Sequence, residues 1–197
     1  MHYAAEPAIT PEGTTLHYSI KTNGSAFTAR AFAAGMLSAF AHSPTIELPD
    51  FEGEILLNPD ALEQSSLRMI IHAASLNDTD DISAKDHDEI NRRMHDEVLE
   101  VDSFPDIVYE CSSVIASKTG EGQYWVALAG DLTMHGVKRG QPVSTRVSIN
   151  GDTLRASGDF SVRLSDYEIQ PVTAAGGTVK LKDEIKLSFA ILARKQP

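Results

Sequence analysis

The sequence has a single cysteine, Cys111, among 197 residues, so no disulfide can form within the chain. A lone thiol fits a reducing compartment. The chain also shows no basic start followed by an apolar run, and no uninterrupted apolar stretch reaches about 18 residues. We therefore expect a cytoplasmic protein that does not span a membrane.

Positive charge is scarce as well. The 17 lysines and arginines are outnumbered by 28 aspartates and glutamates, which gives a formal net charge of -11. Nucleic acids are bound through clusters of cations that displace counterions from the phosphate backbone. This charge balance excludes nucleic acid as an expected partner.

Catalytic and nucleotide-binding motifs are missing too. The sequence contains no G-x-S-x-G nucleophile elbow, no G-x-x-x-x-G-K-S/T phosphate loop and no G-x-G-x-x-G after a predicted strand. Cys111 has no histidine beside it in the sequence. We therefore expect a protein that is not an enzyme and that uses no cofactor.

What the chain does have is a regular alternation of apolar and polar residues. Residues 1–13 lack any period and indicate a loose N-terminal segment, whereas residues 14–197 are long enough for a single domain. In residues 153–164 the even-numbered side chains are apolar or small and the odd-numbered ones are polar. Roughly eight such segments, separated by turn residues, predict an all-β antiparallel barrel or sandwich.

One long segment has a helical period instead. In residues 85–100, KDHDEINRRMHDEVLE, the side chains of Ile90, Met94 and Val98 recur every four residues. We expect Asp86 to cap this helix, with Glu89 completing a capping box.

The polar side of this helix contains His-Asp-Glu twice, which raises the question of a metal or acid/base site. His87 and His95 are eight residues apart, about 80° around a helix, so they do not readily share one ion. Ion pairs four residues apart, from Asp88 and Glu89 to the two arginines that follow, account for most of the charges. We therefore interpret the repeat as a solvated helix face and expect no metal.

Three stretches resemble motifs of the YceI-like family. SFPDIVYECSSV (103–114) is similar to its acid-aromatic-Pro block after a helix, GDLTMHGVKR (130–139) to its Gly-x-Leu-Thr hairpin, and VRLSDYEI (162–169) to its basic-x-Asp-aromatic strand end. Their order and spacing agree, and the resemblance covers about residues 18–195. AGMLSAFAHSPTIEL (34–48) departs from the family's H-x-G-x5-G-x-F spacing, as in a divergent branch.

The resemblance implies a lipocalin-like, eight-stranded antiparallel barrel with one main helix packed beside or over it. It also implies an interior that can hold a long isoprenoid chain. Whether the inward side chains fill the barrel or line a cavity stays open at this point, because eight strands lie at the boundary between the two. The candidate ligand-binding residues are Val126, Leu128, Phe160, Val162, Leu187 and Phe189 on the strands and Ile90 and Met94 on the helix.

A polar head group on such a ligand would need a cation or a hydrogen-bond donor at the mouth of the barrel. The candidates are Arg30, Arg163, His42 and His72, with Lys138 and Arg139 as further cations. His42 falls in a segment, residues 33–43, that we expect to form a short helix before Pro44.

Three functions are considered on this basis. The first is non-enzymatic binding, transport or sequestration of an isoprenoid or another long apolar molecule in the barrel. The second is a structural or interaction module, possibly a homodimer, with a filled barrel and its function on the acidic residues 77–86. The third is a metal-dependent hydrolase, which requires at least three ligands to converge.

Overall fold

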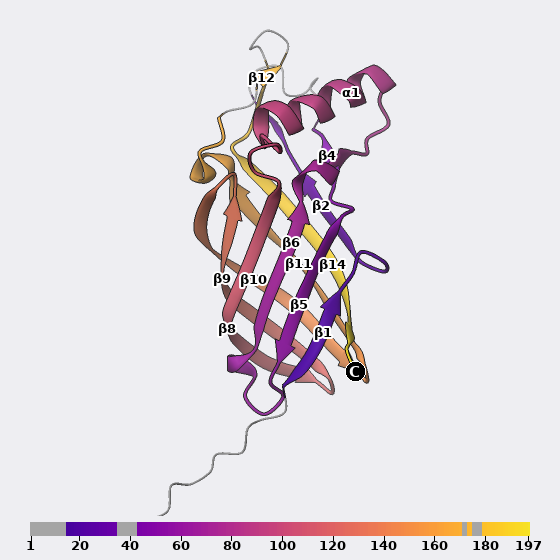
Figure 1. The fold of residues 1–197 in the computed structure, drawn as a ribbon, viewed down its shortest axis with the longest axis vertical. Coiled ribbons are helices and arrows are strands. Elements are labelled where there is room, and N and C mark those ends of the chain that lie inside the picture. Colours follow the sequence, from indigo (N-terminus) through magenta and orange to yellow (C-terminus); the bar gives the residue numbers. More distant parts are fainter. Residues whose placement is uncertain (1–14, 35–42, 171–172, 175–178) are drawn as a thin grey trace, which may run out of the picture.

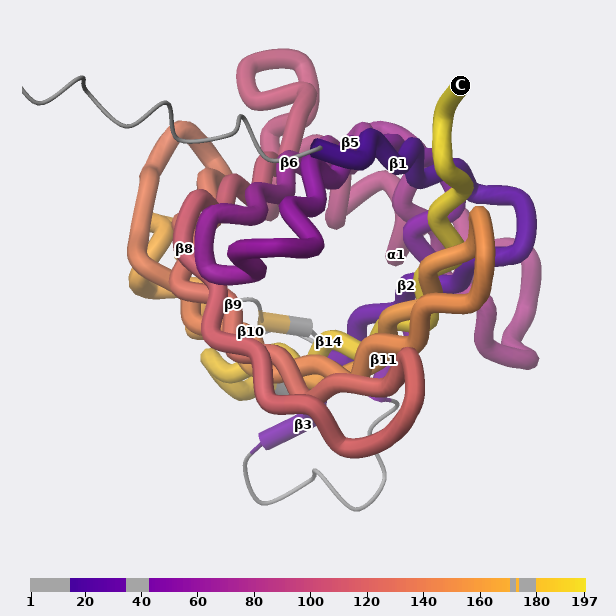
Figure 2. The backbone as a smooth tube through the Cα atoms, turned by 90° about the horizontal axis from the view of Figure 1, so that it is seen from below, coloured from indigo at the N-terminus to yellow at the C-terminus, as the bar shows by residue number. Residues whose placement is uncertain are grey.

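The computed structural model describes residues 15–34, 43–170, 173–174 and 179–197. Within these ranges, eight antiparallel strands form a closed barrel, seen from the side in Figure 1 and from below in Figure 2. Around the wall they are β1 (Leu16–Ile20), β5 (Phe51–Leu57), β6 (Ser66–His72), β8 (Asp106–Gly120), β9 (Gln123–Met134), β10 (Val137–Asn150), β11 (Thr153–Arg163) and β14 (Glu184–Lys195). Because β1 also pairs with β14, the barrel closes and the predicted fold is confirmed.

The alternation in the sequence is what turns these strands into a wall with an apolar inside. In β11, Leu154 and Val162 are buried while Arg155 is exposed, as a period of two requires. The turns that join β8 to β9 and β10 to β11 contain Gly122 and Gly151, both with positive φ. Glycine adopts that conformation without steric cost.

Three wall strands are broken near the end of the barrel that carries the helix, which we call the upper end. They are continued there by β2 (Ala26–Arg30), β4 (Thr45–Glu47) and β7 (Asn77–Asp78). β14 pairs with β2, β2 with β4, and β4 with β7. Two breaks have a local cause: Gly24 makes a turn at φ 84°, and Pro49 has no N–H to donate.

The remaining short elements lie at the two ends of the barrel. They are the 3₁₀ helices η2 (Leu62–Gln64), η3 (Ala73–Ser75) and η5 (Leu164–Tyr167) and a small sheet of β3 (Ala33–Ala34), β12 (Thr173–Ala174) and β13 (Val179–Leu181). Residues 33–34 are therefore strand rather than helix, since they pair with β13. Residues 35–42 of the predicted short helix, which include His42, lie outside the described residues.

A bulge in β8 changes which side chains face inward. Its register against β9 shifts between Cys111 and Val114, so that the odd-numbered residues are buried before the shift and the even-numbered ones after it. The Cys111 Sγ donates to the carbonyl oxygen of Ser113 at 3.1 Å, and burial raises the pKa of this thiol. Past the bulge, Ile115 is left 71% exposed on the outer wall.

The predicted helix is confirmed, but it begins and ends differently from the expectation. It comprises α1 (Ala84–Arg93) and a π-helical continuation, η4 (Met94–Val98). Ser83 is the N-cap, and its Oγ accepts a hydrogen bond from the Asp86 N–H at 3.2 Å. Asp86 is thus the third residue of the helix and not its cap, because a serine hydroxyl three residues earlier already satisfies that N–H.

The ion pairs of α1 also differ from the predicted ones. Glu89 pairs with Arg92 at 3.1 Å, and Arg93 pairs with Glu97 at 3.0 Å, in place of Asp88–Arg92 and Glu89–Arg93. The helical backbone continues through η4 and brings Glu97 within reach of both arginines, at 3.1 Å from Arg92. These are exposed pairs, which contribute little to stability one by one.

The two histidines of the repeat point back into the fold, so the interpretation as a wholly solvated face was wrong. The Nδ1 of His87 lies 2.9 Å from the buried Asp78 carboxylate, and the Nε2 of His95 lies 2.8 Å from the Leu76 carbonyl oxygen. Asn91 accepts a hydrogen bond from the backbone N–H of Asp78 at 2.8 Å. One face of α1 is therefore fastened to β7 by polar contacts.

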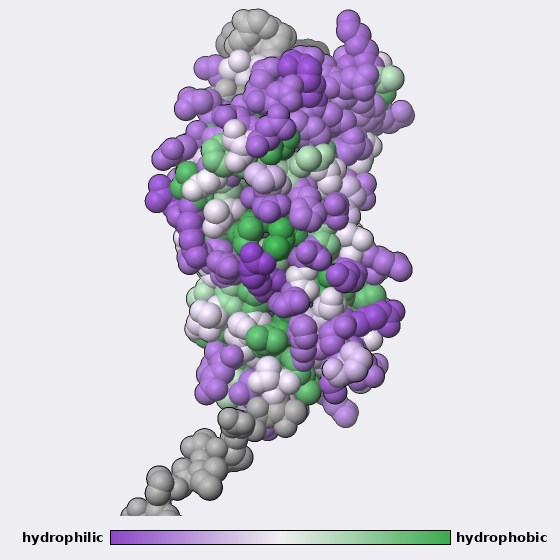
Figure 3. All heavy atoms as spheres, viewed as in Figure 1, coloured by the Kyte–Doolittle hydropathy of each residue, from purple (hydrophilic) through white to green (hydrophobic). Residues whose placement is uncertain are grey.

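The outer surface differs between the two ends of the molecule. Figure 3 shows hydrophilic residues crowded around α1 and small apolar groups scattered lower on the wall. No helix in the described part of the chain has the length and apolar character needed to cross a membrane.

Candidate functional site

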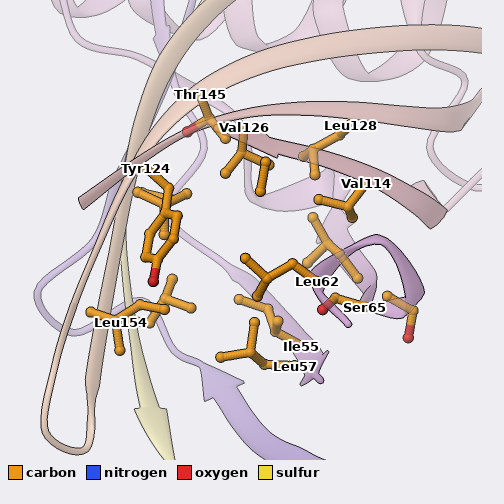
Figure 4. A pocket seen from close by; sticks show the side chains of 16 residues that line it. Ile55, Leu57, Leu62, Ser65, Val114, Tyr124, Val126, Leu128, Thr145 and Leu154 are labelled. Atoms are coloured by element: carbon orange, nitrogen blue, oxygen red, sulfur yellow. The ribbon is translucent and has the colours of Figure 1, made fainter. Parts of the chain in front are cut away.

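The lower end of the barrel, opposite α1, contains an apolar cavity of about 100 Å³ (Figure 4). Six wall strands and η2 contribute to its lining. The residues are Ile55, Leu57, Leu62, Ser65, Ser66, Leu67, Val114, Ala116, Tyr124, Val126, Leu128, Thr145, Val147, Ile149, Leu154 and Ala156. No side chain among them carries a charge.

Side-chain direction repeats every two residues along a strand, so alternate residues of each wall strand point into the barrel. Tyr124, Val126 and Leu128 alternate along β9, and Leu154 and Ala156 do so along β11. η2 reaches the site from the loop between β5 and β6. In Figure 4 its Leu62 side chain points toward the centre of the ring of lining residues.

The few polar groups around the cavity are mostly engaged elsewhere. The Thr145 hydroxyl donates to the Ser157 carbonyl oxygen at 3.0 Å, and the Ser65 Oγ accepts from the Asn58 N–H at 3.1 Å. Tyr124 differs, because its hydroxyl has no hydrogen-bond partner among the described residues. Figure 4 shows that hydroxyl on the side of Leu154.

Four phenylalanine rings pack together in the upper half of the barrel. Phe27 contacts Phe51, Phe160 and Phe189 at centroid separations of 6.0–6.4 Å, within the range of favourable edge and tilted contacts. Phe160 and Phe189, both partly buried, also contact each other, at 6.3 Å. These rings therefore take up part of the upper interior.

The strand residues proposed from the sequence as ligand contacts divide between these two halves. Val126 and Leu128 line the cavity. Phe160, Val162, Leu187 and Phe189 belong to the upper core and do not line it. Ligand binding by these four residues stays a prediction.

Leu67, Val147 and Tyr109 pack against both apolar clusters of the barrel, and the first two also line the cavity. The ring of Tyr109 crosses the inner wall over Gly130, and its hydroxyl donates to the Gln141 carbonyl oxygen at 3.0 Å. Burial raises the pKa of Tyr109 well above that of a free tyrosine, so the hydroxyl stays protonated and keeps donating.

The helix does not border the cavity. Ile90, Met94 and Val98 pack against the main core, as the helical period predicts, but none of them lines the cavity. Any contact of Ile90 or Met94 with a ligand is therefore still a prediction.

The proposed head-group residues also lie away from the cavity. Arg30 stacks on Phe32 at 5.7 Å, and Arg163 ends β11 beside Glu184 of β14. The Nδ1 of His72 lies 2.9 Å from Asp106 on the outer side of the wall. Its hydrogen bond to the Asp106 carboxylate raises the pKa of His72.

The two further cations are held on the outside as well. Lys138 lies 3.3 Å from Glu110 and 3.5 Å from Asp131, which raises the pKa of Lys138. The Nε of Arg139 donates to the Asp166 carbonyl oxygen at 3.1 Å. Neither side chain lines the cavity.

A metal centre is not assembled in the part of the chain that the structure describes. No three histidine, cysteine, aspartate or glutamate side chains there come together as a ligand set. His72, His87 and His95 each have a different partner: Asp106, Asp78 and the Leu76 carbonyl oxygen.

Most residues of the cavity were not predicted from the sequence, although the alternation of apolar and polar residues indicates some of them. Tyr124 alternates with Val126 and Leu128 in the same strand, so its inward direction follows from the pattern. Leu62 carries no such signal, because η2 lies in a loop whose position depends on the barrel around it. Val114 was hidden by the bulge that precedes it.

Known structures share this architecture. A Burkholderia cenocepacia protein, BcnA, is 18% identical, with a TM-score of 0.66 over 88% of this chain and 98% of that one. A polyisoprenoid binding domain from Saccharophagus degradans is 12% identical, with a TM-score of 0.66 over 92% and 99% of the two chains. A Campylobacter jejuni YCEI protein is 19% identical, with a TM-score of 0.54 over 77% and 85%.

At these identities the structures establish a common fold. A search of curated proteins finds no match. The model of the YceI-like domain, however, matches residues 9–193, nearly the whole sequence. The chain therefore belongs to the YceI-like family.

Proposed function

We propose that the protein binds an apolar molecule, isoprenoid in type, in the lower cavity and carries or sequesters it without catalysing a reaction. The observation that supports this most is the cavity itself, a partly open space lined mostly by aliphatic side chains. Burying apolar chain there gains about 0.8 kcal/mol per methylene, so no catalytic group is needed for binding.

Two further observations support the proposal. One structural neighbour, from Saccharophagus degradans, is described as a polyisoprenoid binding domain. The described residues also show neither a metal ligand set nor a polar group in the cavity beyond hydroxyls. A cytoplasmic place of action is part of the same proposal.

A pair of variants tests whether the cavity is the binding site. Ala156 faces the cavity from β11, and Ala190 is exposed on neighbouring β14 at almost the same height, opposite Ser157. Ala156→Leu should fill the cavity and abolish co-purification of an apolar ligand in native mass spectrometry. Ala190→Leu should leave it unchanged.

Two results would count against the proposal. If Ala156→Leu retains ligand as well as Ala190→Leu does, the ligand lies elsewhere. If the wild-type protein carries no ligand and takes up none from a panel of isoprenoid alcohols, the binding function itself fails.

An interaction module is a second candidate, and one observation favours it. Ile115 and Trp125 are 71% and 46% exposed on adjacent strands, and Ile115 pairs with Ala127, two residues from Trp125. Two large apolar side chains side by side on the outer wall suit a contact with another protein, a homodimer included. Light scattering during size exclusion should show an oligomer that Trp125→Ser dissociates, whereas a wild-type monomer contradicts this candidate.

A further inference from the structure

We infer that the cavity takes a small, uncharged ligand group of about five carbon atoms, with at most one hydroxyl or carbonyl oxygen. This inference rests on the proposed function and narrows it. It also revises the expectation of a long chain lying along the barrel, because phenylalanine rings of the protein take up part of the space under the helix.

The volume sets the size of the group. An apolar cavity of about 150 Å³ in a protein interior holds one benzene molecule, whereas sites for drug-sized ligands measure about 300–1,000 Å³. The cavity here measures about 100 Å³. It is therefore smaller than the benzene site and accommodates roughly one five-carbon isoprene unit.

The packing above the cavity prevents a longer chain from passing upward. Tyr109 lies across the wall where Gly130 leaves room, and its hydroxyl is fixed to β10 at Gln141. Above it, Phe27 contacts Phe160 and Phe189. An added segment would have to displace several packed rings, which costs more free energy than burying each methylene returns.

The lining determines the charge of the ligand. None of the sixteen lining residues is ionisable at neutral pH, and Lys138 and Arg30 make their contacts outside the cavity. A carboxylate or phosphate placed there would lose its hydration without gaining a partner. The group that enters must therefore be neutral.

One polar contact is available to such a group. The Tyr124 hydroxyl borders the cavity and is free of hydrogen bonds within the described chain, whereas Thr145 and Ser65 are engaged by backbone groups. It can donate to, or accept from, one oxygen of an alcohol, aldehyde or ketone. We assign Tyr124 as the residue that distinguishes such a ligand from a pure hydrocarbon.

The test is a titration of the intact protein with straight-chain alcohols from 1-butanol to 1-decanol, followed by the methyl NMR signals of its leucines and valines. Affinity should rise about fourfold per methylene up to about five carbons and then level off. At pH 7, hexanoate should bind at least about tenfold more weakly than 1-hexanol.

A variant tests the role of Tyr124. Tyr124→Phe should lower the affinity for 1-hexanol by about two- to tenfold and leave the affinity for toluene unchanged, because only the alcohol loses a hydrogen bond. Tyr167→Phe is the matched control, since Tyr167 is buried in η5 and does not line the cavity.

The outcomes separate the two proposals. The proposal of a small neutral ligand group is overturned if affinity keeps rising to 1-decanol, or if hexanoate binds as tightly as 1-hexanol. The proposal that the protein binds apolar molecules would survive either result. An equal effect of Tyr124→Phe on toluene and 1-hexanol overturns the role of Tyr124. If no alcohol shifts any methyl signal, the proposed function itself is refuted.

Discussion

Single residues decide where this barrel is open and where it is closed. Gly130 is the clearest case, because a Cβ at that position would lie 2.5 Å from the Tyr109 ring and 2.7 Å from the Glu110 carbonyl oxygen. The missing side chain lets Tyr109 lie flat on the inner wall and reach Gln141. The position of Tyr109 between the cavity and the core thus depends on residue 130 being glycine, because the methyl group of an alanine there would clash with the ring.

Gly130→Ala should therefore destabilise the protein by about 1–3 kcal/mol, since the backbone oxygen cannot move aside as a side chain would. Urea unfolding measures this. Gly140→Ala is the control, because the nearest atom to its added Cβ is 3.9 Å away. Equal midpoints for the two variants would show that the close packing of Tyr109 on Gly130 is not needed.

His72 gives a prediction about pH. Its hydrogen bond to Asp106 raises its pKa above the usual 6.5, so the folded state holds the proton more tightly than the unfolded state does. The pair therefore stabilises the fold fully below about pH 6.5, and this contribution disappears as pH rises through the raised pKa.

An NMR titration of the His72 ring should show that raised pKa in the wild-type protein. In Asp106→Asn the pKa should fall, because the acceptor that favours the imidazolium has lost its charge. An unchanged His72 pKa in that variant would mean that Asp106 is not the cause.

At the scale of elements, α1 is attached to the barrel by polar contacts as well as by its apolar stripe. Asp78 of β7 is buried, and burial together with the negative charge of Asp80 raises the pKa of its carboxyl. The imidazole of His87, 2.9 Å away, acts in the opposite direction by favouring the ionised carboxylate. The duplicated His-Asp-Glu sequence thus contributes a fastening between helix and strand.

His87→Phe should destabilise the protein by about 1–3 kcal/mol at pH 7, because it leaves a buried carboxylate without its partner. Lys85→Ala, on an exposed position of the same helix, should change stability by less than about 0.5 kcal/mol. Thermal unfolding of both variants provides the comparison. Equal melting temperatures would show that the His87–Asp78 contact does not hold the helix.

η2 is the element that closes the cavity from the loop side. Leu62→Ala should enlarge the cavity, lower stability by about 2–4 kcal/mol and extend the alcohol series by one or two carbons before affinity levels off. Calorimetric unfolding and the methyl titration measure the two effects. A cavity whose capacity does not change would mean that Leu62 is not part of its wall.

For the whole molecule, the period of the sequence was enough to predict an antiparallel barrel or sandwich, and the resemblance to the YceI-like family pointed to the barrel. The alternation in β9 and β11 is uninterrupted, and the four-residue period of Ile90, Met94 and Val98 predicts one helix with one apolar face. The cap was predicted at Asp86 and lies at Ser83, because the two are both good capping residues three positions apart.

The division of the interior could not be predicted in this way. Whether Phe160 faces a ligand or another ring depends on the register that brings it to Leu187, and on the position of Phe27 from a distant strand. The bulge after Cys111 reverses the alternation and moves Val114 inward without any break in composition. Such features arise only when the strands pair in the assembled barrel, so they cannot be seen in the sequence pattern of one strand.

The most direct test of the account is to locate a bound probe within the intact protein. With saturating 1-hexanol, intermolecular NOEs to the methyl groups of Leu128 and Leu154 in the lower cavity are predicted, with none to Ile185 or Leu187 in the upper core. NOEs to Ile185 and Leu187 without contacts to Leu128 and Leu154 would contradict the central claim that the lower cavity is the binding site.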